Sequence, residues 1–404
     1  MNIAILGGGP AGLRAAEIAV SAGANVTLYE AKASVGRKFL IAGKGGLNLT
    51  HSEPLERFAS RYSGGSPRGF WASLLTEFDN NALCEWASEL GVETFIGTSG
   101  RIFPKESKAA PLLRRWVERL RALGVQFLMH HRLEEITQAE VRLLLKFSVE
   151  DRPKIYSHDA AILALGGASW PNTGSDGKWT SLLNDLGVAI SPLLPANCGW
   201  EVNWPQDILK EAEGLPVKNI ALSAGSHTIL GELLITRYGL EGGALYQLGR
   251  TLRSMEFPEC KLDLKPTFSA EQLADKLFLQ MTGDPILLLR RAILKWRLGM
   301  AASSLLKHLL PPAALESPLA LARFAKAIPI PVLGPRSIEE AISTSGGVSF
   351  SELDQNLMIK RLPGLFVAGE MIDWEAPTGG YLIQGCFATG TRAANGALDY
   401  LRNH

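Results

Sequence analysis

Residues 2–30 read NIAILGGGPAGLRAAEIAVSAGANVTLYE. The alternation of apolar runs and glycines predicts a short strand over 2–6, a loop over 7–12 and a helix over 13–22. A second strand is predicted over 25–29. This strand–loop–helix–strand order is the first half of a Rossmann-type unit.

The loop contains G-x-G-x-x-G, formed by Gly7, Gly9 and Gly12. In such a loop the first glycine permits a tight turn and the second lets the backbone approach a pyrophosphate. The third lets the helix pack closely on its strand. Glu30 ends the second strand, where a carboxylate hydrogen-bonds a ribose. The stretch therefore predicts a dinucleotide-binding site.

A cleaved secretory signal is the alternative for the same residues, because Ala22 and Ala24 flank a small residue in an apolar region. No basic segment precedes the apolar run, and residues 7–12 interrupt it with glycine and proline. We therefore expect this stretch to be part of the folded protein, and the protein to be cytoplasmic.

The composition is that of a globular enzyme. The chain has 404 residues, of which 46% are hydrophobic, enough for two or three domains with substantial cores. Its 41 Lys and Arg nearly balance 40 Asp and Glu, so we expect no overall electrostatic field that attracts nucleic acid or an anionic membrane. No apolar run approaches the ~20 residues of a membrane span. The four cysteines are scattered, which indicates buried thiols and neither disulfides nor a zinc site.

A second informative stretch covers residues 36–50 and reads GRKFLIAGKGGLNLT. Its basic residues lie among glycines directly after the ribose acid, so they are expected near the same diphosphate. Asn48 and Thr50 add hydrogen-bonding groups, and Leu40, Ile41 and Leu47 argue for burial. The alternative is a flexible surface loop with solvated charges.

This segment resembles the G-R-K-x-L-I-S-G-G-G-R-C-N-x-T motif of a bacterial FAD flavoprotein family. Its members are described as NAD(FAD)-utilising dehydrogenases or aminoacetone-oxidase-like enzymes. Three further stretches are similar to that family: GRIFP at 100–104, ALGGASWPNTG at 164–174, and GLFVAGE at 364–370 followed by TGGY at 378–381. This sequence departs from the family at Gly46 and Leu47, where Arg and Cys are usual, which suggests altered substrate contacts.

The resemblance implies FAD as the cofactor. At the closing motif, residues 366–368 read as a buried strand that Gly369 ends. Glu370 then lies at the carboxyl end of that strand, where ligands bind in open α/β sheets. The motifs and the resemblance together give the expected cofactor-binding residues: Gly7, Gly9, Pro10, Ala11, Gly12, Glu30, Ala31, Arg37, Lys38, Asn48, Leu49, Thr50, Leu133, Ala164, Leu165, Gly166, Gly369, Glu370, Gly380, Tyr381 and Leu382.

The expected fold class is α/β, a Rossmann-like FAD-binding domain of the glutathione-reductase type with an inserted β-rich domain and a nested helical cap. The alternating and helical periods place a hairpin over 133–147 and a long helix over 381–401. The expected boundaries are 1–190 and 351–404 for the FAD-binding domain, 191–258 and 327–350 for the β-rich insert, and 259–326 for the helical cap.

The expected function is FAD-dependent oxidation of a small organic substrate, such as an amine, by hydride transfer to flavin N5, with O₂ or another acceptor reoxidising the flavin. One alternative is an NAD(P)H-dependent reductase of an unsaturated or quinone-like substrate, and another is a non-catalytic redox sensor. No second glycine fingerprint is visible, so any NAD(P)H is expected to bind transiently. The sequence names no catalytic side chain, metal site or nucleic-acid partner, because the flavin itself carries the chemistry.

Overall fold

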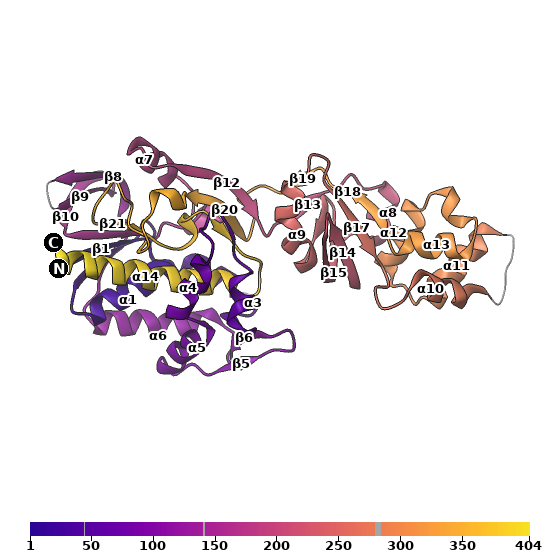
Figure 1. Cartoon of the computed structure of the whole chain (residues 1–404), viewed down its shortest axis with the longest axis horizontal. Helices are drawn as coiled ribbons and strands as arrows, with labels where there is room; N and C mark the ends of the chain where they lie inside the picture. The colour runs from indigo at the N-terminus through magenta and orange to yellow at the C-terminus, as the bar shows by residue number, and fades with distance from the viewer. Residues whose placement is uncertain (44, 140–141, 279–283) are drawn as a thin grey trace. The chain divides into compact units, whose positions relative to one another are not determined.

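A computed structural model describes residues 1–43, 45–139, 142–278 and 284–404. The chain forms two compact units (Figure 1). The first comprises Met1–Pro195 and Ile342–His404, and the second Ala196–Ala341. The sequence placed the corresponding boundaries near 190 and 350.

The first unit is built on a parallel sheet of five strands in the order β21-β11-β1-β2-β7. The register brings the predicted first strand between two neighbours, with Ile5 opposite Leu28 on one side and Ile162 on the other. Its strands are β1 (Asn2–Leu6), β2 (Asn25–Tyr29), β7 (Gln126–Leu128), β11 (Ala160–Leu163) and β21 (Leu365–Val367). Most of their side chains are fully buried, as expected for a parallel sheet covered on both faces.

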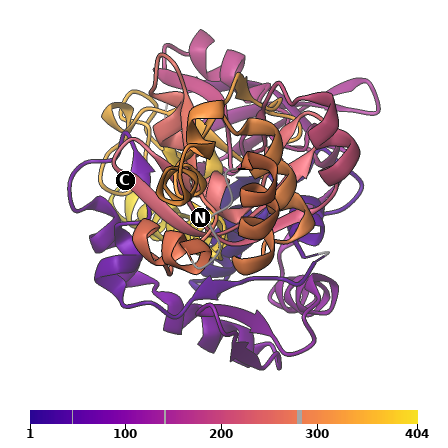
Figure 2. The ribbon, with the colours of Figure 1, turned by 90° about the vertical axis from the view of Figure 1, so that its right-hand side faces the viewer.

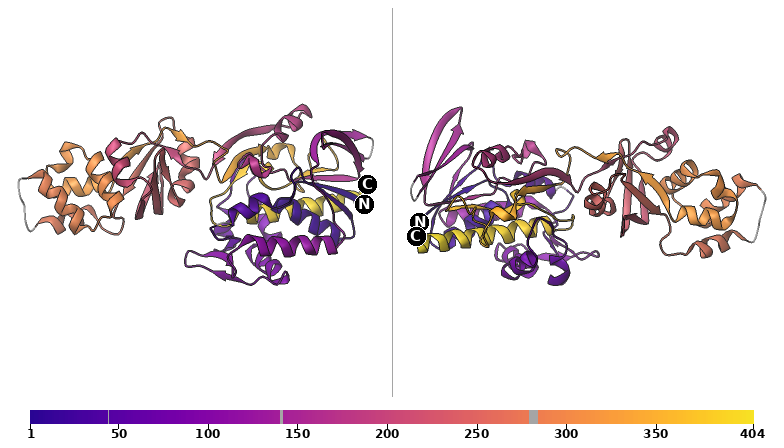
Figure 3. Two further views of the ribbon diagram at one scale, coloured as in Figure 1. Left: turned by 180° about the vertical axis from the view of Figure 1, so that it is seen from behind. Right: turned by 45° about the horizontal axis from the view of Figure 1, so that its top comes forward.

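Two helices from opposite ends of the chain pack together beside this sheet. They are α1 (Pro10–Ser21) and α14 (Tyr381–Asn403). Figure 3 shows α14 in yellow beside α1 in indigo. Their close approach depends on Gly390, where a Cβ atom would lie 2.4 Å from the carbonyl oxygen of Ala11. Small residues along α14 therefore let two helix backbones approach each other.

Smaller elements complete the first unit. An antiparallel sheet has the order β10-β9-β8. The hairpin predicted over 133–147 corresponds to β8 and β9. Residues 140 and 141 lie outside the described residues. The remaining elements are α2 (Arg37–Ala42), β3 (Thr50–His51), α3 (Leu55–Ala59), β4 (Ser63–Gly64), α4 (Phe70–Glu77), α5 (Asn80–Glu89), β5 (Thr94–Ile96), β6 (Arg101–Pro104), α6 (Ala109–Ala122), β8 (Arg132–Ala139), β9 (Arg142–Val149), β10 (Arg152–His158), η1 (Pro171–Thr173), α7 (Trp179–Asp185), β12 (Ile190–Ala196), β20 (Ser343–Val348), η3 (Phe350–Glu352), η4 (Gly369–Met371) and β22 (Trp374–Glu375).

The second unit has its own hydrophobic core around an antiparallel sheet in the order β18-β17-β14-β15-β16-β13-β19. Helices of this unit are drawn in orange in Figure 2. Its elements are β13 (Trp200–Glu201), α8 (Gln206–Ala212), β14 (Pro216–Ala224), β15 (His227–Thr236), β16 (Gly239–Glu241), α9 (Gly243–Arg253), β17 (Glu259–Asp263), α10 (Ala270–Phe278), α11 (Pro285–Lys295), α12 (Met300–Leu309), η2 (Pro312–Leu315), α13 (Pro318–Ala325), β18 (Ile328–Pro331) and β19 (Gly334–Pro335).

Three strands differ from the expected subdivision of the insert. β12 begins at the expected boundary of the insert, yet it belongs to the first unit as far as Pro195. β17 lies at the start of the segment expected to be helical, and its burial alternates, with Cys260 and Leu262 buried and Lys261 exposed. That alternation is a strand pattern, which the helical period of the following residues masked. β20 lies in the segment expected to close the β-rich insert, yet it belongs to the first unit, where it pairs with β12.

Candidate cofactor and active site

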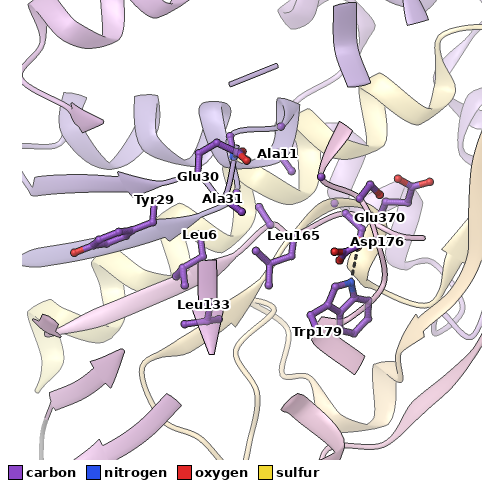
Figure 4. Close-up of a pocket in the computed structure, with 18 of the residues that line it drawn as sticks. Leu6, Ala11, Tyr29, Glu30, Ala31, Leu133, Leu165, Asp176, Trp179 and Glu370 are labelled. Carbon is purple, nitrogen blue, oxygen red and sulfur yellow. Dashed lines mark hydrogen bonds between the residues drawn. The ribbon is translucent and has the colours of Figure 1, made fainter. Parts of the chain in front are cut away.

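A cavity of about 530 Å³ lies at the carboxyl ends of the parallel strands in the first unit (Figure 4). The loop after β1, residues 7–11, forms one wall. Glu30 after β2, Ala164 after β11 and Glu370 after β21 contribute further lining. Ligands of open α/β sheets bind at this edge. The volume is typical of small-molecule and cofactor sites.

The glycine loop has the geometry that the motif requires. Gly7 has a φ of +105°, and a Cβ atom there would lie 2.3 Å from the carbonyl oxygen of Ala164. A Cβ atom on Gly12 would lie 2.0 Å from the carbonyl oxygen of Gly7. Gly9 differs, because nothing lies within 4 Å of its Cβ position and it faces the cavity. Gly9 and Pro10 also begin α1, whose free N–H groups favour an anion.

Glu30 is held by two backbone donors. Its Oε2 accepts a hydrogen bond from the Gly8 N–H at 2.9 Å, and its Oε1 accepts one from the Lys32 N–H at 2.8 Å. Burial raises the pKa of the Glu30 carboxyl, and these two hydrogen bonds oppose that rise. Each carboxylate oxygen keeps a further lone pair, so the group can still accept hydroxyl donors from a ribose.

A charged cluster lies where β21 ends. Lys38 Nζ is 2.6 Å from Glu370 Oε2 and 2.6 Å from Ser169 Oγ. Glu370 Oε1 accepts a hydrogen bond from the Thr344 N–H at 2.8 Å. The Lys38 and Glu370 side chains are both mostly buried and line the cavity, so they present a fixed pair of opposite charges to a ligand.

The residues present fit a dinucleotide cofactor. Among the described residues, Ser175 Oγ and Asn48 Oδ1 are buried polar atoms without a hydrogen-bond partner. Buried polar groups are normally paired, and Asn48 lies outside the cavity lining, so of these two residues Ser175 is the one placed to find its partner in a molecule bound in the cavity. Ser175 lines the cavity, and its hydroxyl could both donate to and accept from such a molecule. The open Gly9 face and the remaining lone pairs of the Glu30 carboxylate fit the same kind of ligand.

The structure brings most of the expected cofactor residues together. Those that line the cavity are Gly7, Gly9, Pro10, Ala11, Glu30, Ala31, Arg37, Lys38, Leu133, Ala164, Leu165, Gly166, Gly369 and Glu370. Gly12 lies behind this wall and packs on Gly7. For all of these residues, direct contact with FAD stays a prediction.

The other expected residues lie outside the cavity lining. They are Asn48, Leu49, Thr50, Gly380, Tyr381 and Leu382. The Thr50 hydroxyl donates to Gln384 Oε1 at 2.8 Å, and a Cβ atom on Gly380 would lie 2.4 Å from Thr50 Cα. Thr50 therefore packs against the start of α14. Lys44, in the same basic stretch, lies outside the described residues.

The segment after the second glycine motif was missed by the sequence analysis. The cavity is lined there by Ser175, Asp176 and, at the start of α7, Trp179. The Trp179 indole N–H donates to the carbonyl oxygen of Gly166 at 2.8 Å, which Figure 4 shows as a dashed line. The signal was the polar and aromatic run SDGKW directly after Gly174, since loop residues beside a ligand-binding turn commonly contribute to the site.

Neither a metal cluster nor a membrane-spanning helix is present in the described part of the chain. No cluster of three or more His, Cys, Asp or Glu side chains is arranged to hold a metal ion there. Within the same residues, every helix is too short or too polar to cross a membrane.

The family model described as HI0933-like protein Rossmann domain matches residues 1–396. The chain belongs to the HI0933-like family. It is an FAD-dependent oxidoreductase with a Rossmann-type α/β fold, as the sequence predicted. This assignment agrees with the cavity at the carboxyl ends of its parallel strands.

Two curated relatives span nearly the whole chain. The chain is 28% identical to a 3-dehydro-bile acid delta(4,6)-reductase of Clostridium scindens, over 98% of this chain and 99% of the relative. It is 24% identical to the ribosomal RNA dihydrouridine synthase of Escherichia coli, over 94% of each.

Among solved structures, a 3-ketosteroid delta1-dehydrogenase of Sterolibacterium denitrificans is similar with a TM-score of 0.54. It has 10% identity and covers 98% of this chain and 99% of that one. A flavocytochrome c3 fumarate reductase is similar with a TM-score of 0.53. It has 14% identity and covers 99% of this chain and 78% of that one. At these identities the similarity concerns the fold.

Glu30 gives a direct test of the assigned ribose contact. Replacing it in Glu30→Ala is expected to lower FAD affinity about 10- to 150-fold, because a charge-assisted hydrogen bond contributes roughly 1.5–3 kcal/mol. Calorimetric titration of FAD into the cofactor-free protein measures the effect. Glu134→Ala removes the same charge from an exposed residue of the same cavity and should change the affinity by less than about 3-fold. Equal losses in the two variants would show that Glu30 acts only through its charge.

Proposed function

We propose that this chain reduces a carbon–carbon double bond conjugated to a carbonyl group in a small organic molecule, with NAD(P)H as a transient electron donor. This is the reductase alternative from the sequence. It replaces amine oxidation as the favoured function.

The observation that supports this proposal is the full-length similarity to two relatives whose names describe related chemistry. One name specifies reduction at the Δ4,6 positions of a 3-dehydro bile acid. The other specifies formation of dihydrouridine, which is uridine with its C5–C6 double bond saturated. Both substrates carry a double bond conjugated to a carbonyl group, which withdraws electrons and makes the bond accept hydride.

A hydrogen-bond donor for such a carbonyl oxygen lies beside the start of α14. Arg101, at the start of β6, is exposed, and its Nε lies 3.8 Å from the Cβ position of Gly379, two residues before the helix. It forms no ion pair within the described residues, and an arginine stays protonated at all working pH values. Bound FAD would supply the hydride. Arg101 would bind the carbonyl oxygen and stabilise the negative charge that develops there.

Two neighbouring side chains are already engaged. His51 Nδ1 accepts from the Glu53 N–H at 3.1 Å, so its Nε2 must carry the proton donated to the Ser99 carbonyl oxygen at 3.0 Å. The Tyr381 hydroxyl donates to Glu53 Oε1 at 2.7 Å. These contacts occupy both ring nitrogens of His51 and direct the Tyr381 hydroxyl toward Glu53. His51 and Tyr381 are therefore already hydrogen-bonded within the protein. Arg101 is the residue that we propose as the hydrogen-bond donor to the substrate carbonyl oxygen.

Anaerobic spectroscopy of the FAD-loaded protein tests the function. NADH or NADPH should bleach the flavin, and a 3-oxo-4-ene steroid should restore its colour. Arg101→Ala should slow that second step about 100-fold or more without changing the FAD content. Bleaching by an amine without nicotinamide, together with no response to the enone, would overturn the proposal and favour oxidation.

We expect the electron donor, NADH or NADPH, to bind weakly. The second unit contains an antiparallel sheet, which lacks the parallel order of a second nucleotide-binding fold. Calorimetric titration of NADH and NADPH into the FAD-loaded protein should therefore give dissociation constants above about 10 μM, equivalent to ~7 kcal/mol. Tighter binding would show a dedicated nicotinamide site.

A further inference from the structure

The helical part of the second unit contains a segment with one sign of charge. Residues 285–315 include five Lys and Arg and no Asp or Glu, in a chain whose totals are 41 and 40. The segment covers α11, α12 and the turn between them. A charge-balanced chain thus concentrates positive charge on one pair of helices.

α11 exposes bulky aliphatic side chains on the same face as one of these charges. Ile286 is 65% exposed and Leu294 is 75% exposed, and the exposed Arg290 lies between them. The three are four residues apart, so they share one face of the helix. The opposite face is buried through Ala292 and Trp296, whose indole N–H donates to the Leu273 carbonyl oxygen at 3.0 Å. One face of α11 is therefore packed against the rest of the unit. The exposed face carries both aliphatic side chains and a positive charge.

The turn after α11 extends this surface. Lys295 and Arg297 are exposed, and Met300, the first residue of α12, is 68% exposed. Arg290, Lys295 and Arg297 take part in no ion pair within the described part of the chain, whereas Lys307 further along pairs with Glu211 at 2.8 Å. We call Ile286, Arg290, Leu294, Lys295, Arg297 and Met300 the α11 surface; Figure 1 labels the helix.

We propose that the α11 surface binds the surface of an anionic phospholipid bilayer. Exposed leucine, isoleucine and methionine side chains can enter the boundary between headgroups and acyl chains, and the adjacent cations can pair with phosphate groups. A single-stranded nucleic acid would share the charge complementarity, but its bases stack on aromatic side chains. The α11 surface carries aliphatic side chains, and this favours lipid.

Sedimentation of the FAD-loaded full chain with vesicles tests the proposal. Binding to phosphatidylglycerol vesicles should exceed binding to phosphatidylcholine vesicles by about 10-fold or more, and it should weaken between 0.1 and 1 M salt. Removing one charge in Arg290→Gln should lower the partition coefficient about 5-fold. Leu294→Asp should lower it at least about 10-fold, because the variant loses an inserting side chain and gains a negative charge.

A matched control is available in the same unit. Leu230 on β15 is 72% exposed, so Leu230→Asp makes the same chemical change away from the α11 surface and should leave vesicle binding unchanged. Equal binding to both kinds of vesicle, or an equal effect of the two leucine variants, would overturn the proposal. So would binding of single-stranded RNA, or self-association, that Leu294→Asp abolishes while vesicle binding persists.

Discussion

Gly9→Leu is expected to lower FAD affinity by at least about 100-fold while leaving the cofactor-free fold intact. Gly9 has an ordinary extended backbone, with φ −80° and ψ 179°, so a side chain causes no backbone strain there. Nothing lies within 4 Å of its Cβ position, and that space belongs to the cavity. A leucine would occupy the volume of the pyrophosphate and remove its contacts with the loop, each contributing roughly 1.5–3 kcal/mol. Calorimetry and thermal melting of the cofactor-free protein measure the two effects.

Gly299 provides the control for this variant. It precedes α12 as Gly9 precedes α1, with φ −70° and ψ 170°, and its Cβ position is also open. Gly299→Leu should therefore leave FAD affinity unchanged. If Gly9→Leu bound FAD as tightly as this control, the pyrophosphate would have to lie elsewhere.

Glu17→Ala is expected to destabilise the first unit by about 3–5 kcal/mol, because it leaves buried donors without an acceptor. Glu17 is 2% exposed. Its Oε2 accepts from the indole N–H groups of Trp86 at 2.9 Å and Trp116 at 3.3 Å, and it pairs with Arg14 at 3.0 Å. Burial lowers the pKa of the Arg14 guanidinium and Glu17 opposes that shift, so removing Glu17 leaves a poorly solvated charge. Urea unfolding of the cofactor-free protein measures the loss.

Glu89→Ala separates burial from charge in this experiment. Glu89 pairs with Arg119, which also pairs with Glu17, but its side chain is 62% exposed. Exposed ion pairs contribute little, so this variant should lose less than about 1 kcal/mol. A similar loss in both variants would contradict the role assigned to buried hydrogen bonding.

The first strand, the glycine loop and the first helix were predictable from the sequence, because a pattern of neighbouring residues specifies each of them. The apolar run 2–6 and the glycine loop gave β1 and the start of α1 to within a few residues. β17 was not predicted, since five residues of alternating burial beside a strong helical period carry little local signal. Pairing of β11 with β21 joins residues about 200 positions apart, and only tertiary packing specifies it.

The residues of the candidate site also fall into those that the sequence predicted and those that it did not. Gly9, Glu30 and Glu370 were found because each follows a predicted strand at a fixed spacing. Trp179 and Asp176 were missed because they reach the cavity through the folding back of a loop, which no short-range pattern records. The ion pair of Lys38 with Glu370 combines two residues found separately, and the sequence did not indicate that they meet.

The division of the first unit into two chain segments also bears on the order of events during synthesis. The glycine loop is made first, but β21, Glu370 and α14 follow only after the whole second unit has left the ribosome. The second unit is continuous in sequence and has its own core, so it can fold while the first unit still lacks a sheet strand and a covering helix. FAD capture would thus be a late step in maturation, because Gly369 and Glu370, which line the cavity, are made after the whole second unit.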